Sequence, residues 1–409
     1  MSKISDIQCY KVLNSRGEWT LRTQVTLNDG SVGVETIPEG ASKGEHEALY
    51  LPVEKAVENV SGTINDLLRG VNPEDQEKID KAMLDLDATE NKSNLGGNSL
   101  ISVSLAVAKA AAVHKNLPLY KYLAKIYGQK DPIKFPTPVF NVLNGGKHAH
   151  NGLSFQEFMV IPSKSVVYDK ALEMGVNVYH KLKKNLSDSG LDVDVGDEGG
   201  FAPNGLNPKK ALDFIKRSTG ELYKTGEEVF FGMDVAAESF WENSDYHIKE
   251  EQLHLSSKQL TTYYRDLMKD YELIYIEDPF YENDEDGWKA FNSEFKNRLM
   301  VVADDLAVTN PVKLRSVISS DLANAVIVKP NQVGTLSETL AFIKEARSAG
   351  MSVIISHRSG DTAEDTFIAD LAVGVNADFI KSGAPARGER VAKYNRLLEI
   401  FHEQNIIKG

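Results

Sequence analysis

The stretch Leu273-Ile274-Tyr275-Ile276-Glu277-Asp278-Pro279 decides the fold class of this 409-residue chain. An apolar run as long as a buried strand is followed directly by two carboxylates. From Phe135 onward the chain alternates short apolar runs of this kind with helical stretches, which predicts parallel strands joined by crossover helices. We therefore expect an α/β fold in this part of the chain.

Eight runs qualify as strands, and eight strands with helices between them predict a closed barrel. The predicted strands are Thr137–Leu143, Glu157–Ile161, Val229–Met233, Leu273–Ile276, Leu299–Ala303, Ala325–Val328, Ser352–Ile355 and Asp378–Ile380. We assign residues 131–409 to a (β/α)8-type catalytic barrel and residues 1–130 to a smaller α+β domain that caps it.

Ionisable residues lie at the carboxyl ends of six successive predicted strands, which is the end of the barrel where barrel enzymes have their active sites. These residues are Asp234, Glu277-Asp278, Asp304-Asp305, Lys329, His357-Arg358-Ser359 and Lys381. A single acid at such a position is usually a helix N-cap. Burying all of these charges around one axis is costly unless a metal or a ligand compensates them. We therefore predict an active site at this end of the barrel.

The order of the charges indicates what this site binds. Asp234, Glu277 and Asp304 offer the hard oxygen ligands that Mg²⁺ prefers. Arg358 has the planar fork that suits a phosphate, and Lys381 suits a carboxylate. The alternative for Lys381 is a surface or ion-paired lysine.

Two further groups are candidates for acid–base chemistry. Lys329 lies between the acids and the other cations, so a metal and a second lysine would lower its pKa and let it act as a base. The alternative is a structural ion pair with Asp304 or Glu277. Glu198, in the turn Gly196-Asp197-Glu198-Gly199-Gly200, is either a catalytic acid held on a loop or part of an ordinary turn.

The N-terminal domain opens with a hairpin. Trp19–Leu27 alternates like a half-buried strand, Asp29-Gly30 is a turn signal, and Ser31–Ile37 returns as a second strand. Helical periodicity follows. Glycines on both sides of Ser42 predict a mobile loop over residues 39–47, with a plain connection between hairpin and helix as the alternative.

Composition excludes several classes of protein. The net charge of −13 argues against a nucleic-acid partner, because neutralising phosphates needs a basic surface. Cys9 is the only cysteine, so no intrachain disulfide forms and a reducing compartment fits. The first ten residues lack a signal-peptide core, and no apolar run is long enough to span a bilayer. We expect a cytoplasmic protein without a transmembrane segment.

The chain closely resembles the enolase family, from Ser15-Arg16-Gly17 nearly to its end. The motifs that carry the resemblance are Asn144-Gly145-Gly146 with His148, Gln156-Glu157-Phe158, Gly196-Asp197-Glu198-Gly199-Gly200, Ile276-Glu277-Asp278-Pro279, Ala303-Asp304-Asp305-Leu306, Lys329-Pro330-Asn331-Gln332, Ser356-His357-Arg358-Ser359-Gly360 and Lys381-Ser382-Gly383-Ala384-Pro385-Ala386-Arg387. The resemblance implies an irregular barrel whose second strand is antiparallel, and the short link from Leu143 to Glu157 suits a hairpin. It also implies a homodimer or a higher homo-oligomer.

The resemblance further implies a glycolytic lyase that interconverts 2-phosphoglycerate and phosphoenolpyruvate with two Mg²⁺ per active site, the second arriving with the substrate. Lys329 would take the C2 proton, and Glu198 would assist loss of the C3 hydroxyl. The implied catalytic residues are Glu198, Lys329, Glu157 and His357. The implied metal ligands are Asp234, Glu277, Asp304 and Ser42. The implied substrate-binding residues are His148, Gln156, Glu157, Glu277, Asp304, Ser356, His357, Arg358, Ser359 and Lys381.

The sequence departs from the family pattern at Glu18-Trp19, Glu39, Lys43 and Ala149-His150-Asn151. These positions lie in or near segments that move in the family, so we expect them to affect loop closure, the second metal and turnover. Two alternatives stay open: an enolase-like scaffold with impaired catalysis, and another superfamily enzyme of the acid-sugar or racemase type. The lyase is favoured because the chain keeps the metal-binding acids, Glu198, Lys329 and the segment Ser356-His357-Arg358-Ser359, which we call the phosphate segment.

Overall fold

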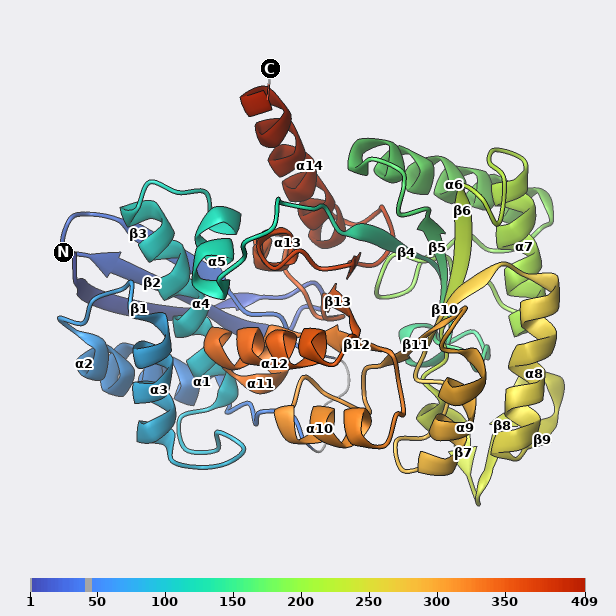
Figure 1. Ribbon diagram of the computed structural model, residues 1–409, viewed down its shortest axis with the longest axis horizontal. Helices are drawn as coiled ribbons and strands as arrows, with labels where there is room; N and C mark the ends of the chain where they lie inside the picture. Colours follow the sequence, from blue (N-terminus) through green and yellow to red (C-terminus); the bar gives the residue numbers. More distant parts are fainter. Residues whose placement is uncertain (1, 41–45, 409) are drawn as a thin grey trace.

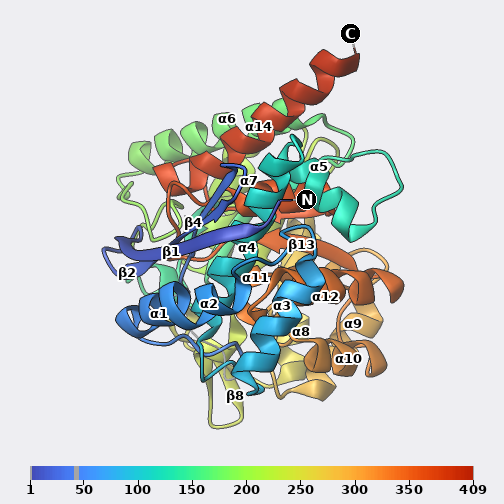
Figure 2. The same ribbon diagram turned by 90° about the vertical axis from the view of Figure 1, so that its left-hand side faces the viewer.

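The computed structural model describes residues 2–40 and 46–408. Its N-terminal part is a three-stranded antiparallel sheet in the order β1 (Ile4–Leu13), β2 (Trp19–Leu27) and β3 (Val32–Thr36), which confirms the predicted hairpin and adds β1. The helices that follow are α1 (Val53–Asn59), η1 (Val60–Ile64), α2 (Asn65–Leu68), α3 (Gln76–Asp87), α4 (Gly97–His114) and α5 (Leu119–Tyr127). Figure 2 shows the sheet and these helices from the side.

The remaining chain forms a closed eight-stranded barrel, as predicted. Its strands are β4 (Thr137–Asn144), β5 (Glu157–Pro162), β6 (Val229–Asp234), β10 (Leu273–Glu277), β11 (Met300–Ala303), β12 (Ala325–Val328), β13 (Ser352–Ser356) and β14 (Phe379–Lys381). β5 runs antiparallel to both of its neighbours, β4 and β6, whereas the other neighbouring pairs are parallel. The irregular topology that the resemblance implied is therefore confirmed.

Helices surround the barrel and separate its strands along the chain (Figure 1). They are α6 (Tyr168–Asp188), α7 (Pro208–Gly220), α8 (Ser257–Asp270), α9 (Glu285–Phe295), α10 (Pro311–Ser319), α11 (Pro330–Val333), α12 (Leu336–Ser348), α13 (Phe367–Gly374) and α14 (Gly388–Lys408). A short meander of β7 (Trp241–Glu242), β8 (Asp245–Ile248) and β9 (Leu253–Leu255) follows β6 and was not predicted. Single-turn helices η2 (Gly146–His148), η3 (Ala237–Phe240) and η4 (Lys249–Glu251) complete the described elements.

Apolar side chains fill the barrel interior and leave its carboxyl end for polar groups. The interior cluster includes Val139, Met159, Tyr275 and Ile354, all fully buried. Close packing of this kind makes the barrel a filled core instead of a pore, so a site can form only at its end.

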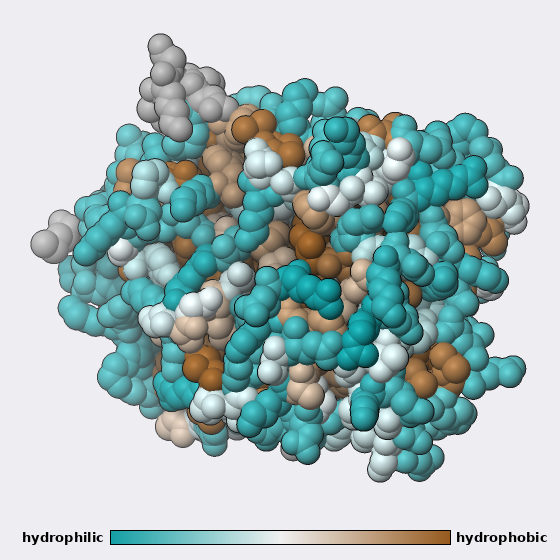
Figure 3. Space-filling model, turned by 45° about the vertical axis from the view of Figure 1, so that its right-hand side comes forward, coloured by the Kyte–Doolittle hydropathy of each residue, from teal (hydrophilic) through white to brown (hydrophobic). Residues whose placement is uncertain are grey.

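The outer surface is predominantly hydrophilic, with apolar side chains in scattered patches (Figure 3). Within the described residues, no helix combines the length and the apolar composition that crossing a membrane requires.

The N-terminal domain is fixed to the barrel through α12. Buried Asp80 of α3 accepts hydrogen bonds from the backbone N–H and the hydroxyl of Ser337, at 2.9 and 2.6 Å. The Ser104 hydroxyl of α4 accepts the backbone N–H of Leu336 at 2.9 Å. These bonds satisfy N–H groups of the first turn of α12 and so hold the N-terminal domain against the barrel.

Gly33 lets β3 and α4 pack at close range. A Cβ atom at Gly33 would overlap the backbone of Ala106 and Ala110 on α4. We expect Gly33→Ala to lower the free energy of unfolding of the N-terminal domain by about 1–3 kcal/mol through overpacking. Urea denaturation monitored by circular dichroism measures this change.

Gly62 provides the matched control, because a Cβ there meets no atom within 4 Å and its backbone is helical. Gly62→Ala should leave stability unchanged or raise it slightly, by about 0.4–1 kcal/mol. Equal losses in the two variants would contradict the packing argument.

Candidate active site at the carboxyl end of the barrel

A pocket opens where the strands end, and segments far apart in the sequence line it. Of the residues that the sequence predicts, it gathers His148, Gln156, Glu157, Glu198, Asp234, Asp304, Lys329, Ser356, His357, Arg358, Ser359 and Lys381. Glu277 does not line this pocket; it is fully buried and pairs with Lys381, which does. Ser42 and Lys43 lie outside the described residues.

Lys381, at the end of β14, is buried among three carboxylates. Its Nζ lies 3.0 Å from Asp234 Oδ2, 2.9 Å from Glu277 Oε1 and 3.2 Å from Glu157 Oε1. Burial alone would lower the pKa of Lys381, but these carboxylates raise it well above its usual value. Lys381 is therefore a permanent cation at the centre of the site.

The buried acids Glu277 and Glu157, which surround Lys381, have raised pKa values. Burial raises the pKa of Glu277 to about 8, and the neighbouring charge of Asp234 adds to the effect. The Tyr275 hydroxyl donates a hydrogen bond to Glu277 from the same strand. Glu277 therefore holds a proton at neutral pH, and additional positive charge beside it would favour its ionised form.

Lys329, at the end of β12, forms an ion pair with Asp304. Burial would lower the pKa of Lys329, yet the Asp304 carboxylate outweighs it and the pKa is raised. This ion pair is the alternative that the sequence left open for Lys329. The lower pKa that the sequence predicts requires a metal close to Lys329 and stays a prediction.

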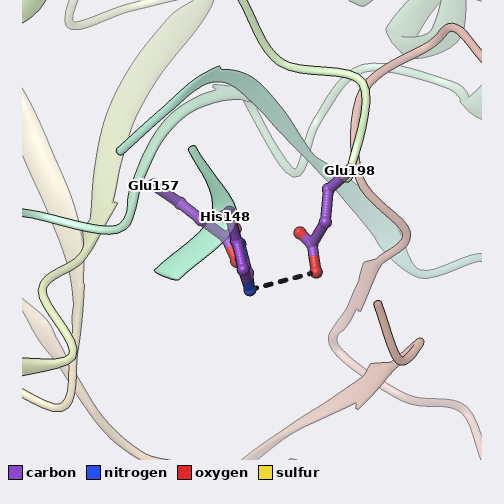
Figure 4. Close-up of side chains that lie close together, drawn as sticks. All are labelled: His148, Glu157 and Glu198. Atoms are coloured by element: carbon purple, nitrogen blue, oxygen red, sulfur yellow. Dashed lines mark ion pairs between the residues drawn. The ribbon is translucent and has the colours of Figure 1, made fainter. Parts of the chain in front are cut away.

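Glu157 and Glu198 form a carboxyl pair beside His148 (Figure 4). His148 Nδ1 lies 3.5 Å from Glu157 Oε1, and its Nε2 lies 3.7 Å from Glu198 Oε1. Asn141 of β4, which sequence reasoning missed, donates a hydrogen bond to Glu198 Oε2 at 3.2 Å. Glu157 and His148 come from β5 and η2 of the irregular hairpin, and Glu198 comes from the acidic turn, which is followed by a bridge between Phe201 and Leu143 of β4.

The two carboxyl groups have pKa values that move in opposite directions. Burial raises the pKa of Glu157 well above its usual value, and the charge of Glu198 adds to this. Burial also opposes ionisation of Glu198, but the neighbouring His148 and His357 rings and the Arg390 guanidinium lower its pKa overall. The surroundings therefore place the pair's proton on Glu157.

The segment after β13 joins the two domains. Arg358 is buried, and its Nη1 donates to Glu47 Oε2 at 3.0 Å, while Glu39 and Gly360 exchange backbone hydrogen bonds of 2.9 and 2.8 Å. Residues on both sides of positions 41–45 are thereby held beside the predicted phosphate site. Glu47 lies in the predicted loop, but its residue type alone gave no sign of this role.

The acidic side chains fit a divalent cation. Asp234 and Glu277 are register partners on β6 and β10, and Asp304 follows the next strand, β11. Asp304 Oδ1 is buried and has no hydrogen-bond partner among the described residues. Such a set of hard oxygen donors suits Mg²⁺ better than a softer metal.

A second acidic group lies beside this set. Asp278, Asp304 and Asp305 offer oxygen atoms that all lie within 4.8 Å of one another. The Asp278 carboxylate, however, accepts the backbone N–H groups of Asp304 and Asp305 at 3.0 and 2.9 Å. We infer that Asp278 holds the turn after β11 in place, which aims Asp304 into the pocket.

Glu18 and Asn151, two of the residues at which the sequence departs from the family pattern, make specific contacts. Glu18 accepts hydrogen bonds from Arg16 Nη2 at 2.6 Å and Nε at 3.1 Å, and Arg16 Nη1 also donates to the Ser359 hydroxyl at 3.3 Å. Asn151 is buried and donates to the carbonyl oxygens of Asn144 and Pro203 at 2.9 and 3.3 Å. Arg16, which Glu18 holds, thus contacts the segment after β13 that carries the predicted phosphate-binding residues Arg358 and Ser359. The hydrogen bonds of Asn151 hold the loop that carries His148.

Comparison with known protein families covers most of the chain. Residues 4–123 match the model of the enolase N-terminal domain. Residues 132–406 match the model of the enolase C-terminal TIM barrel domain.

The raised pKa values make cation binding sensitive to pH. Glu277, with a pKa of about 8, holds a proton that a divalent cation bound to this carboxylate must displace. We expect Mg²⁺ affinity to rise from about pH 6 to about pH 9, with protons released on binding. Titration calorimetry in buffers of different ionisation enthalpy measures both quantities. Constant affinity without proton release would contradict this.

Proposed function

The chain belongs to the enolase family, and on that premise we propose that it is a Mg²⁺-dependent lyase that interconverts 2-phosphoglycerate and phosphoenolpyruvate plus water, as in glycolysis. The observation that carries the proposal is that a lysine, a carboxyl pair and a buried arginine line one pocket. These are Lys329, Glu157 with Glu198, and Arg358. Together they provide a base, an acid and an anion-binding group at one place.

Binding of the substrate uses the cationic half of the site. Arg358 and Ser359 would hold the phosphate, because guanidinium and hydroxyl groups donate to its oxygen atoms. Lys381 would face the carboxylate, since its ammonium stays charged among three acids. The remaining proposed contacts are those of His148, Gln156, Ser356 and His357, which line the same pocket.

The reaction then needs two proton transfers at neighbouring carbons. Lys329 would take the proton from C2, and Glu198 would give a proton to the C3 hydroxyl so that the C3–O bond breaks and water leaves. Glu157 holds a proton at the start, and His148 lies between the two carboxyl groups. We propose that this proton reaches Glu198 within the pair once the substrate has entered.

Asp234, Glu277 and Asp304 would hold the first Mg²⁺, and Ser42 would contribute to a second that arrives with the substrate. Bound there, magnesium would supply positive charge that stabilises the dianion formed at the carboxylate and weakens the hold of Asp304 on Lys329. Assembly as a homodimer or higher homo-oligomer, a cytoplasmic location and a domain boundary near residue 130 stay predictions from the sequence.

The base is tested by turnover. Purified protein with Mg²⁺ and 2-phosphoglycerate should form phosphoenolpyruvate, followed by its ultraviolet absorbance. Lys329→Ala should lower kcat by about 10²–10⁴-fold, the usual contribution of a general base. The control is Lys183→Ala, because Lys183 is exposed on α6 and does not line the pocket. Lack of turnover in the folded wild-type protein would contradict the proposed function.

The two proton transfers can be separated. In Glu198→Gln, product formation should fall by about 10²–10⁴-fold, while Lys329 still exchanges the C2 proton with solvent. Proton NMR of 2-phosphoglycerate in D₂O with Mg²⁺ measures this exchange. If exchange and product formation are lost together, Glu198 does not act after the base in the way proposed.

A further inference from the structure

Arg390 connects the phosphate segment with the acidic turn, although neither its position nor its sequence context singled it out. It lies in the first turn of α14 and is fully buried. Its Nη2 donates to the carbonyl oxygen atoms of Ser359 at 2.6 Å and Asp197 at 3.2 Å, and its Nη1 donates to that of Arg358 at 2.7 Å. One guanidinium therefore holds the two segments that carry Arg358 and Glu198.

The same guanidinium also contacts the ring of His357. Arg390 Nη1 lies 2.6 Å from His357 Nδ1. An arginine has only donors and stays protonated in proteins, so the ring nitrogen that faces it must be the acceptor. A neutral imidazole carries its proton on the other nitrogen, and His357 is therefore the tautomer with a proton on Nε2.

The protonated nitrogen faces the reacting groups. His357 Nε2 lies 3.3 Å from Glu198 Oε2, yet it is buried and makes no hydrogen bond of acceptable geometry with any described residue. The ring lines the pocket. A small movement would let Nε2–H donate to Glu198 or to an oxygen atom of a bound ligand, which the other tautomer could not do.

The surroundings of the ring favour its neutral form. The charged groups that face it are Glu198 on the acidic turn, Arg390 on α14 and Asp361 after β13. Burial lowers the pKa of His357 to about 4, and Arg390 contributes in the same direction against the pull of Glu198. The ring therefore stays neutral across the physiological range.

We propose that Arg390 is a positioning residue that fixes His357 in the Nε2-protonated tautomer and thereby sets the hydrogen bond available to Glu198. Its kinetic consequence rests on the proposed function, but the tautomer itself does not. Without Arg390, the ring would be free to change tautomer, and its pKa would rise because Glu198 would act without the opposing charge of Arg390. Glu198 would then face either a lone pair or a full positive charge.

Lys393 offers a matched control, because it is a second fully buried cation one turn along α14. Its Nζ lies 2.6 Å from Asp361 Oδ2, which also lies 3.4 Å from Arg390 Nη1. It donates to the carbonyl oxygen atoms of Thr362 and Glu389, at 3.2 and 3.0 Å. A purely structural role for buried charge on this helix would make Lys393 and Arg390 equivalent.

The first test observes the tautomer without any substrate. In ¹⁵N-labelled wild-type protein, the His357 ring, assigned by its absence in His357→Gln, should show a protonated Nε2 and an unprotonated Nδ1 from about pH 5.5 to about pH 8. A protonated Nδ1 would overturn the proposal, whether or not any variant folds. Because no turnover is involved, this result is independent of the reaction assigned to the protein.

The second test compares Arg390→Met with Lys393→Met. In Arg390→Met, we expect the pKa of His357 to rise above its wild-type value, kcat to fall about 10–100-fold, and the acidic limb of the pH profile to move to higher pH. Arg390→Lys keeps one cationic donor and should recover part of kcat. Lys393→Met should keep the shape of the wild-type profile. The same shift of the acidic limb in both Met variants, or in neither, would overturn the proposal.

Discussion

Charge compensation at the carboxyl end of the barrel is the constraint on which the rest of the structure depends. The Lys381 ammonium is buried within 3.2 Å of carboxylates from β5, β6 and β10. Its own strand, β14, closes the barrel against β4. Buried charges of this kind are tolerated only when opposite charges lie next to one another. Closure of the barrel by β14 therefore also brings Lys381 to the acids and assembles the site.

The antiparallel strand β5 gives this site its acid–base asymmetry. Because β4 returns directly through a hairpin, Glu157 and His148 lie beside the acidic turn that carries Glu198. The two carboxyl groups then meet different partners, and their pKa values move apart. The proton of this carboxyl pair therefore rests on Glu157, one transfer away from Glu198.

The sequence predicted the eight barrel strands and the strand-end residues, because buried parallel strands leave long apolar runs with abrupt polar ends. It missed β1, whose alternation is broken by exposed Tyr10 and Leu13, and the meander β7–β9, whose strands are too short to show a period. It also missed Arg390 and Asn141. Their roles arise from tertiary contacts, and a buried arginine on a helix looks in sequence like any surface arginine. The pKa directions of Lys329 and Glu198 likewise depend on distances that no motif encodes.

The central claim is that one pocket places a base and an acid against neighbouring carbons of a phosphorylated carboxylate. A crystal structure with Mg²⁺ and 2-phosphoglycerate tests this most directly. The account predicts the phosphate at Arg358 and Ser359, the carboxylate toward Lys381, C2 within about 3–3.5 Å of Lys329 Nζ, and the C3 hydroxyl toward Glu198. A ligand bound with its phosphate away from Arg358, or with C2 out of reach of Lys329, would contradict it.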